Sequence, residues 1–123
     1  MTSRLPFLAA VMALHTLTVT AEPAVISTPT YNAEGGFYEI SNWQNLLWIS
    51  QNPEHWDKDY VQIDDIDFFD ADPPINKWNN NEGWSPIGVV SPSWEPFTGN
   101  YDGGGYTIEN LYIDKPTAEG IGL

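Results

Sequence analysis

The 123-residue sequence contains no cysteine, which excludes a disulfide framework and a cysteine nucleophile. Basic residues are almost as scarce: four lysines and arginines stand against seventeen acidic residues, for a net charge of −13. A surface with this charge repels the phosphates of nucleic acids and of anionic lipid head groups. Nucleic-acid binding is therefore excluded, and the plainest role of the acidic surplus is to keep the protein soluble.

The sequence also lacks the common catalytic motifs. Neither H-E-x-x-H nor G-x-S-x-G occurs, and His55 is the one histidine after the first 21 residues. A histidine in the polar context P-E-H-W-D is expected to be a solvated loop residue. The glycines at 103–105 have no neighbouring lysine and precede a strand pattern, so a turn is favoured over a phosphate-binding loop. We expect no enzymatic activity and no cofactor.

Long apolar runs are absent except near the N-terminus. The sole arginine, Arg4, precedes an apolar run from Leu5 to Leu14, and small residues follow at Val19-Thr20-Ala21. This order predicts a secretory signal peptide over residues 1–21, because the run is too short to cross a bilayer. Cleavage after Ala21 would leave three lysines against seventeen acids, a net charge of −14. The predicted location is secreted or at the cell surface, with no transmembrane segment in this chain.

The rest of the chain is expected to form one unit after a leader. Residues 22–36 are rich in Pro, Thr, Ser and Gly and predict a flexible leader that is ordered only near its end. The remaining residues, 37–123, begin with a strand candidate at Phe37–Ile40. A helix should run from Ser41 to Gln51, with Ser41 as N-cap, and should end before Asn52-Pro53.

Strand patterns dominate after the helix. Tyr60 to Phe68 alternates apolar and polar residues with a slip at Asp64-Asp65, and a similar pattern with a slip at Asn110 runs from Tyr106 to Ile113. A polar loop over residues 69–82 and a buried corner at Trp84–Gly88 separate the two patterns. Short strands joined by Gly, Pro and Asn corners, without helical crossovers, predict an all-β coil.

The segment from Phe97 to Leu123 reads F-T-G-N-Y-D-G-G-G-Y-T-I-E-N-L-Y-I and ends in G-I-G-L. It resembles the GLUG-motif family of bacterial secreted and surface proteins, whose repeats read F-x-G-x-[FY]-D-G-x-G-[YH]-x-I-x-N-L-x-I and close on Gly-Leu-x-Gly. The resemblance covers roughly residues 38–123 and is most specific from Ser85 to Ile113. It implies a right-handed parallel β-helix, capped by the helix over 41–51 and stopping within its first, partial repeat. Trp43, Leu46 and Leu47 would then cover the end of the coil.

Two sets of side chains are candidates for binding. The acidic run contains Asp65, Asp67 and Asp70, which could supply oxygens to calcium, although a solvated strand edge is the favoured interpretation. Trp56, Trp78 and Trp94 lie in polar surroundings and could stack on sugar rings, although core packing is favoured for most tryptophans. Trp43, Trp48 and Trp84 fit a core.

Two classes of function follow. The favoured one is an exported, non-catalytic surface or adhesin-like protein whose partners are surface glycans or host and other extracellular proteins. The alternative is a scaffold segment of a larger secreted enzyme, either a metallopeptidase or a polysaccharide-active β-helix, or a carbohydrate-binding module. The enzyme alternative requires catalytic residues outside this sequence.

Overall fold

The computed structural model describes residues 24–89, 94–116 and 122–123. The predicted signal peptide over 1–21 lies outside these residues. Within them the elements, in chain order, are β1 (Thr30–Asn32), β2 (Phe37–Ile40), α2 (Trp43–Gln51), η1 (Pro53–His55), β3 (Asp59–Gln62), β4 (Ile66–Asp67), η2 (Phe68–Asp70), η3 (Ile75–Lys77), α3 (Trp78–Asn81), β5 (Asn100–Asp102) and β6 (Ile108–Glu109).

The strands form two sheets. A four-stranded sheet has the order β1-β2-β3-β5, and β4 pairs with β6 in a two-stranded sheet. The β1-β2 pair is antiparallel, whereas β2-β3, β3-β5 and β4-β6 are parallel. The register aligns one tyrosine from each strand of the larger sheet: Tyr31, Tyr38, Tyr60 and Tyr101. The rings of Tyr38 and Tyr60 stack with centroids 5.6 Å apart, so aromatic contacts reinforce the parallel pairing.

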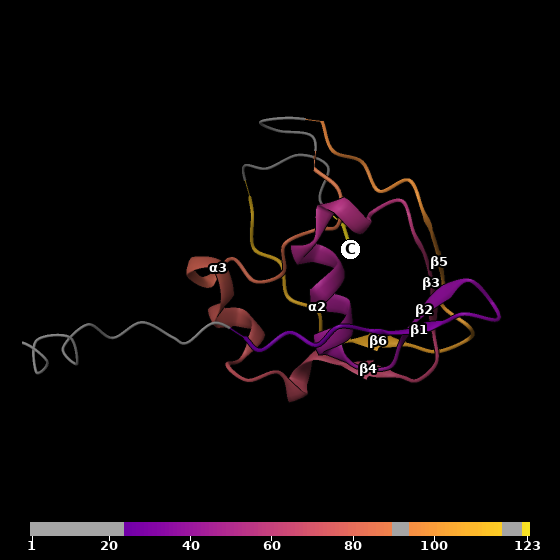
Figure 1. Ribbon diagram of the computed structural model, residues 1–123. Coiled ribbons are helices and arrows are strands. Elements are labelled where there is room, and N and C mark those ends of the chain that lie inside the picture. The colour runs from indigo at the N-terminus through magenta and orange to yellow at the C-terminus, as the bar shows by residue number, and fades with distance from the viewer. Residues whose placement is uncertain (1–23, 90–93, 117–121) are drawn as a thin grey trace, which may run out of the picture.

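The fold is mixed α/β, and the all-β parallel β-helix expected from the sequence is wrong. Helix α2 connects the parallel neighbours β2 and β3, so it is a crossover between strands and not a cap at the end of a coil. Strand β1 breaks the parallel pattern because it pairs antiparallel at the edge of the sheet. In Figure 1, α2 lies in the middle of the molecule, between the four-stranded sheet and α3.

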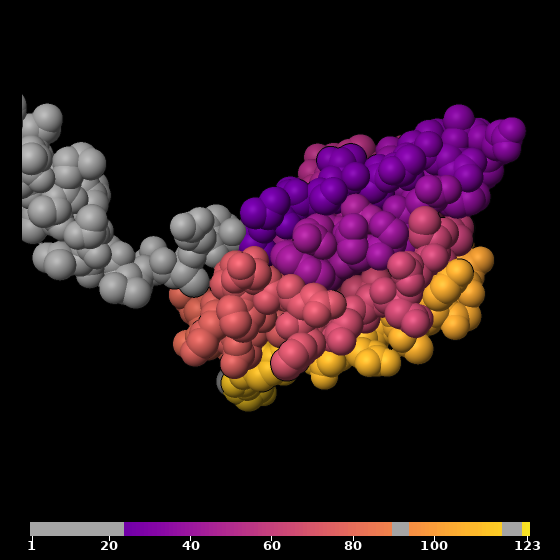
Figure 2. Space-filling model, turned by 90° about the horizontal axis from the view of Figure 1, so that it is seen from below, coloured from indigo at the N-terminus to yellow at the C-terminus, as the bar shows by residue number. Residues whose placement is uncertain are grey.

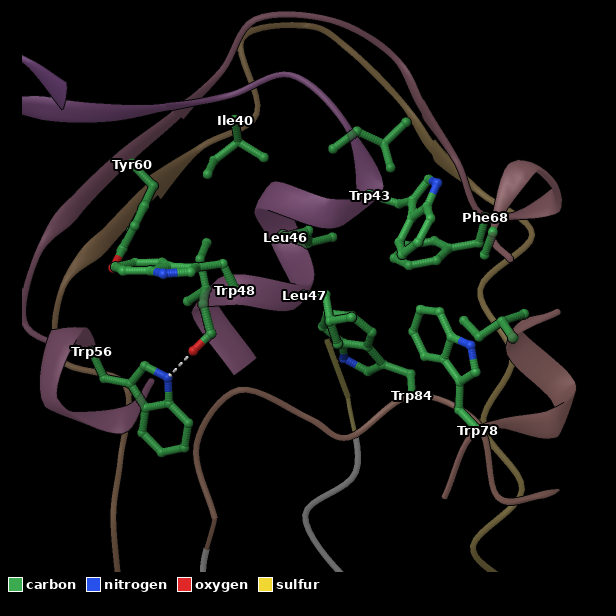
Figure 3. Close-up of a cluster of buried hydrophobic side chains, with 14 residues drawn as sticks. Ile40, Trp43, Leu46, Leu47, Trp48, Trp56, Tyr60, Phe68, Trp78 and Trp84 are labelled. Atoms are coloured by element: carbon green, nitrogen blue, oxygen red, sulfur yellow. Dashed lines mark hydrogen bonds between the residues drawn. The ribbon is translucent and has the colours of Figure 1, made fainter. Parts of the chain in front are cut away.

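The chain is layered in sequence order. Figure 2 shows residues 24–50, then the region of β3 to α3, then residues 100–114 as neighbouring bands across one face. The core between these bands is strongly aromatic, as Figure 3 shows: Trp43, Trp48, Trp56, Tyr60, Phe68, Trp78 and Trp84 are all buried. The rings of Phe68 and Trp84 meet edge to face with centroids 5.4 Å apart. Core roles for Trp43, Trp48 and Trp84 are therefore confirmed.

Helix α2 has its N-cap one residue later than the sequence predicts. Its N-cap is Asn42, whose side chain accepts a hydrogen bond from the Asn45 main-chain N–H at 2.8 Å. The predicted N-cap, Ser41, instead donates from both its main-chain N–H and its hydroxyl to Asn45 Oδ1. The predicted burial of Trp43, Leu46 and Leu47 is confirmed, and so is the end of the helix at Asn52.

The two predicted long strands are broken by corners. The slip at Asp64-Asp65 is a corner between β3 and β4, which lie in different sheets. Of the second predicted strand, Tyr106–Ile113, only the residues of β6 form a ladder. The β6 strand pairs with β4, whereas Tyr60 in β3 pairs with Tyr101 in β5.

Residues 69–82 were expected to be a polar loop, but they contain short helical turns with buried apolar side chains. Ala71, Ile75 and Trp78 are buried within this segment. The three asparagines that follow Trp78 all have positive φ, so α3 contains a left-handed turn and is not a regular helix. Asparagine tolerates this conformation better than most residues.

The leader predicted over residues 22–36 contributes to the sheet near its end. Strand β1 lies within it, and Ser27, which precedes β1, contacts α2: the Ser27 carbonyl accepts from Asn45 Nδ2 at 2.9 Å. Gly99 of the F-x-G motif has a steric explanation, since a Cβ there would overlap the main chain of Lys58. Among the residues described, no helix has the length and hydrophobicity needed to span a bilayer.

Candidate functional site

The candidate calcium residues lie along the β4-β6 sheet, where two of them tie neighbouring segments together. Asp65 Oδ1 accepts from the main-chain N–H and the hydroxyl of Thr107, at 2.9 and 3.2 Å. Asp67 Oδ1 accepts from Asn110 Nδ2 at 2.8 Å and from the Phe69 N–H at 2.9 Å. Both carboxylates therefore bridge residues more than forty positions apart in the sequence.

The hydrogen bonds to Asp67 also change its acidity. Donation from Asn110, and to a smaller extent from Phe69, lowers the pKa of the Asp67 carboxyl, and desolvation opposes the shift. Hydrogen bonds to the charged form favour that form. Asp67 consequently stays ionised to a lower pH than an ordinary aspartate.

The third candidate, Asp70, ends η2 with an exposed side chain. Within residues 24–89, 94–116 and 122–123, no three histidine, cysteine, aspartate or glutamate side chains are placed to hold a metal ion together. The acidic residues that the structure describes thus do not converge on one point.

The candidate sugar-stacking tryptophans occupy different environments. Trp56 and Trp78 are buried, and their indole N–H groups donate to the carbonyls of Ile49 at 2.7 Å and Pro73 at 2.8 Å. Figure 3 shows the Trp56 bond. Their rings belong to the core and are not presented to a ligand. Trp94 differs, because the residue is 70% exposed. It lies next to Glu95, which forms an isolated bridge with Val89.

His55 is not the solvated loop residue that the sequence suggested. Its ring lies 4.9 Å from that of Trp48, centroid to centroid, and its Nδ1 atom is buried without a hydrogen-bond partner in the described part of the chain. Its main-chain oxygen accepts from the Tyr60 hydroxyl at 2.6 Å. The prediction is wrong because η1 folds back onto α2 and brings the ring against Trp48.

Gln62 is an organising residue that the sequence analysis did not identify. It is 1% exposed, and its amide donates to the carbonyls of Asp64 and Thr107, both at 2.9 Å. Its Oε1 accepts from the Tyr101 hydroxyl at 2.9 Å. Burial raises the pKa of that hydroxyl, which keeps it protonated as the donor. The signal in the sequence that could have identified Gln62 is the position of a glutamine within an otherwise apolar strand pattern.

The chain is similar to a known protein. The chain is 36% identical to Halomucin of Haloquadratum walsbyi over 109 residues. The match covers 86% of this chain and 1% of Halomucin, so this chain spans about one-hundredth of the length of that relative. No protein-family model matches the chain, and no solved structure matches it.

Proposed function

We propose that this chain belongs to an exported, non-catalytic protein of the cell surface. The observation that carries the proposal is that the side chains most able to bind a ligand are already engaged in contacts within the fold. Asp65, Asp67 and Gln62 tie strands and corners together, and five of the six tryptophans are buried. Side chains committed in this way hold the fold together, so the molecule would act through its surface.

Two further observations support the location. The similarity to Halomucin is consistent with a secreted or surface protein. The first 21 residues have the charge and hydropathy order of a secretory signal. Membership of the GLUG-motif family is also a proposal. The activity of any longer protein that contains this sequence is a proposal as well.

The export proposal is tested by expressing the full chain and a version lacking residues 2–21 in a secreting host. We expect the full chain outside the cytoplasm with a mature N-terminus at Glu22, and the shortened version inside. Intact-mass measurement of the exported material checks the cleavage site. Retention of Met1 or a cytoplasmic full chain would contradict the proposal.

A carbohydrate-binding role is the second candidate, and the exposure of Trp94 favours it. An indole ring with one open face can stack on the apolar C–H surface of a sugar. Glycan-array binding by the full chain should fall when Trp94→Ala is introduced. The matched control is Phe69→Ala, because Phe69 is 82% exposed on a different element. Equal signals from the parent chain and both variants would remove this candidate.

A further inference from the structure

The main-chain oxygen of Leu123 receives two hydrogen bonds from one short segment. The indole Nε1 of Trp84 donates to it at 3.0 Å, and the main-chain N–H of Ile87 donates at 2.7 Å. Two donors that converge on a single oxygen are a recognition geometry for a main-chain carbonyl.

Trp84 is held in place by contacts other than its hydrogen bond to Leu123. Trp84 is fully buried, its ring packs on Phe68, and its main-chain N–H is bonded to the Tyr112 carbonyl at 2.8 Å. Gly83, beside it, has φ +84 and lies so close to Tyr112 that a Cβ would overlap the Tyr112 main chain. The indole N–H therefore cannot turn to another acceptor without moving the core.

The segment that supplies the oxygen is partly exposed. The chain is anchored up to Lys115, which forms an ion pair with Glu82 at 2.9 Å, beside the bond from the Asp114 N–H to the Glu82 carbonyl. Leu123 is 38% exposed, and a Cβ on Gly122 would meet no atom within 4 Å. The hydrogen bonds described for this dipeptide are the two that its main-chain oxygen accepts.

We propose that Trp84 and Ile87 form a binding clamp for a main-chain oxygen of an extended peptide segment, filled here by Gly122–Leu123 of the same chain. An empty clamp leaves both donors without this acceptor, and the hydrogen bonds regained on binding favour occupancy. Covalent linkage supplies the segment at an effective concentration in the millimolar range. A peptide of the same sequence in solution should occupy the clamp when the chain's own segment is removed.

The first test compares two matched variants of the full chain. Trp84→Phe and Trp78→Phe each remove a buried indole N–H that donates to a carbonyl, but only the first donates to Leu123. We measure the rate at which carboxypeptidase releases Leu123. Trp84→Phe should raise the rate about tenfold and Trp78→Phe should not, because a lost hydrogen bond of this kind corresponds to about one order of magnitude in the open population. Equal rates in both variants would overturn the proposal.

The second test leaves the core intact and decides the matter if Trp84→Phe does not fold. Deleting residues 122–123 should speed hydrogen exchange at the Ile87 amide. Adding acetyl-Gly-Ile-Gly-Leu-amide at millimolar concentration should slow it again. The Thr98 amide, which is bonded to the Trp56 carbonyl, is the internal control and should not change. If the exchange rate of the Ile87 amide changes with neither the deletion nor the peptide, the clamp is refuted.

Discussion

At the scale of single residues, polar side chains in this protein join segments that are distant in sequence. Gln62 contacts three partners across the corners that follow β3 and β5. Asp67 links the end of β4 to Asn110, just beyond β6. These contacts satisfy the hydrogen bonding of main-chain groups where strands end, which apolar side chains cannot do.

Asn110→Gly should raise the pKa of Asp67 toward its ordinary value of 3.8. Asn110 has φ +61, and glycine keeps this backbone conformation while removing the amide donor. The carboxyl resonance of Asp67, followed by NMR titration, measures the shift. Because the folded-state pKa is depressed, the contribution of Asp67 to stability is present above about pH 4 and is lost as the pH falls through the folded value. An unchanged titration curve would contradict the role of Asn110.

Gln62→Leu should lower the free energy of unfolding by about 2 kcal/mol or more. It leaves the carbonyls of Asp64 and Thr107 and the hydroxyl of Tyr101 without their partner, and unsatisfied buried groups are costly. Asn100→Ala is the control, because it breaks an exposed amide–carboxylate bond to Asp59 between neighbouring strands. Denaturant unfolding should show a small change for the control. Equal losses would indicate that burial of Gln62 is not the cause.

At the scale of elements, helix α2 contributes the largest number of buried residues to the core. Six of its nine residues are buried, including Leu46 and Ile49 at full burial. It is covered on more sides than the usual amphipathic helix, since the sheet, the leader and the segment 68–84 all contribute contacts around it.

Leu46→Ala should cost about 2–5 kcal/mol of stability, since it opens a cavity at a site with no exposed surface. The N-cap gives an independent check on the same helix. Asn42→Ala should cost about 1 kcal/mol, whereas Asn42→Ser retains an acceptor oxygen and should cost less. Thermal or denaturant unfolding compares the three variants. A Leu46→Ala protein as stable as the parent would show that α2 does not sit in the core.

The elements were easier to predict than their connections. The 3.6-residue spacing of Trp43, Leu46 and Leu47 located the helix, and the strand at Phe37–Ile40 was evident from its composition. The pairing was not predictable, because no local pattern indicates that β3 lies beside β2 across a helix. The binding candidates Trp56 and Trp78 were in polar sequence surroundings, yet their burial depends on contacts with residues far along the chain.

At the scale of the whole molecule, charge should govern stability. Net charge is −13, and the described residues contain two ion pairs, Lys58–Asp57 and Lys115–Glu82. Uncompensated like charges destabilise a compact state through mutual repulsion. Salt shortens the range of this repulsion, from about 10 Å at 0.1 M to about 3 Å at 1 M ionic strength.

The melting temperature should therefore rise with sodium chloride over this range. A triple variant of exposed carboxylates, Glu34→Gln, Glu54→Gln and Glu95→Gln, removes three negative charges and should show a shallower rise. Differential scanning calorimetry of both proteins measures the slopes. Identical slopes would mean that salt acts on apolar burial and not on the charges.

The central claim concerns the pairing: a mixed α/β fold in which β3 lies between β2 and β5 while β4 pairs with β6. Isotope-edited NOE measurements on the full chain test it most directly. The account predicts cross-strand NOEs between Tyr38 and Tyr60, between Tyr60 and Tyr101, and between Ile66 and Ile108. NOEs that instead place Tyr60 beside the strand at Ile108, in one continuous ladder, would contradict it.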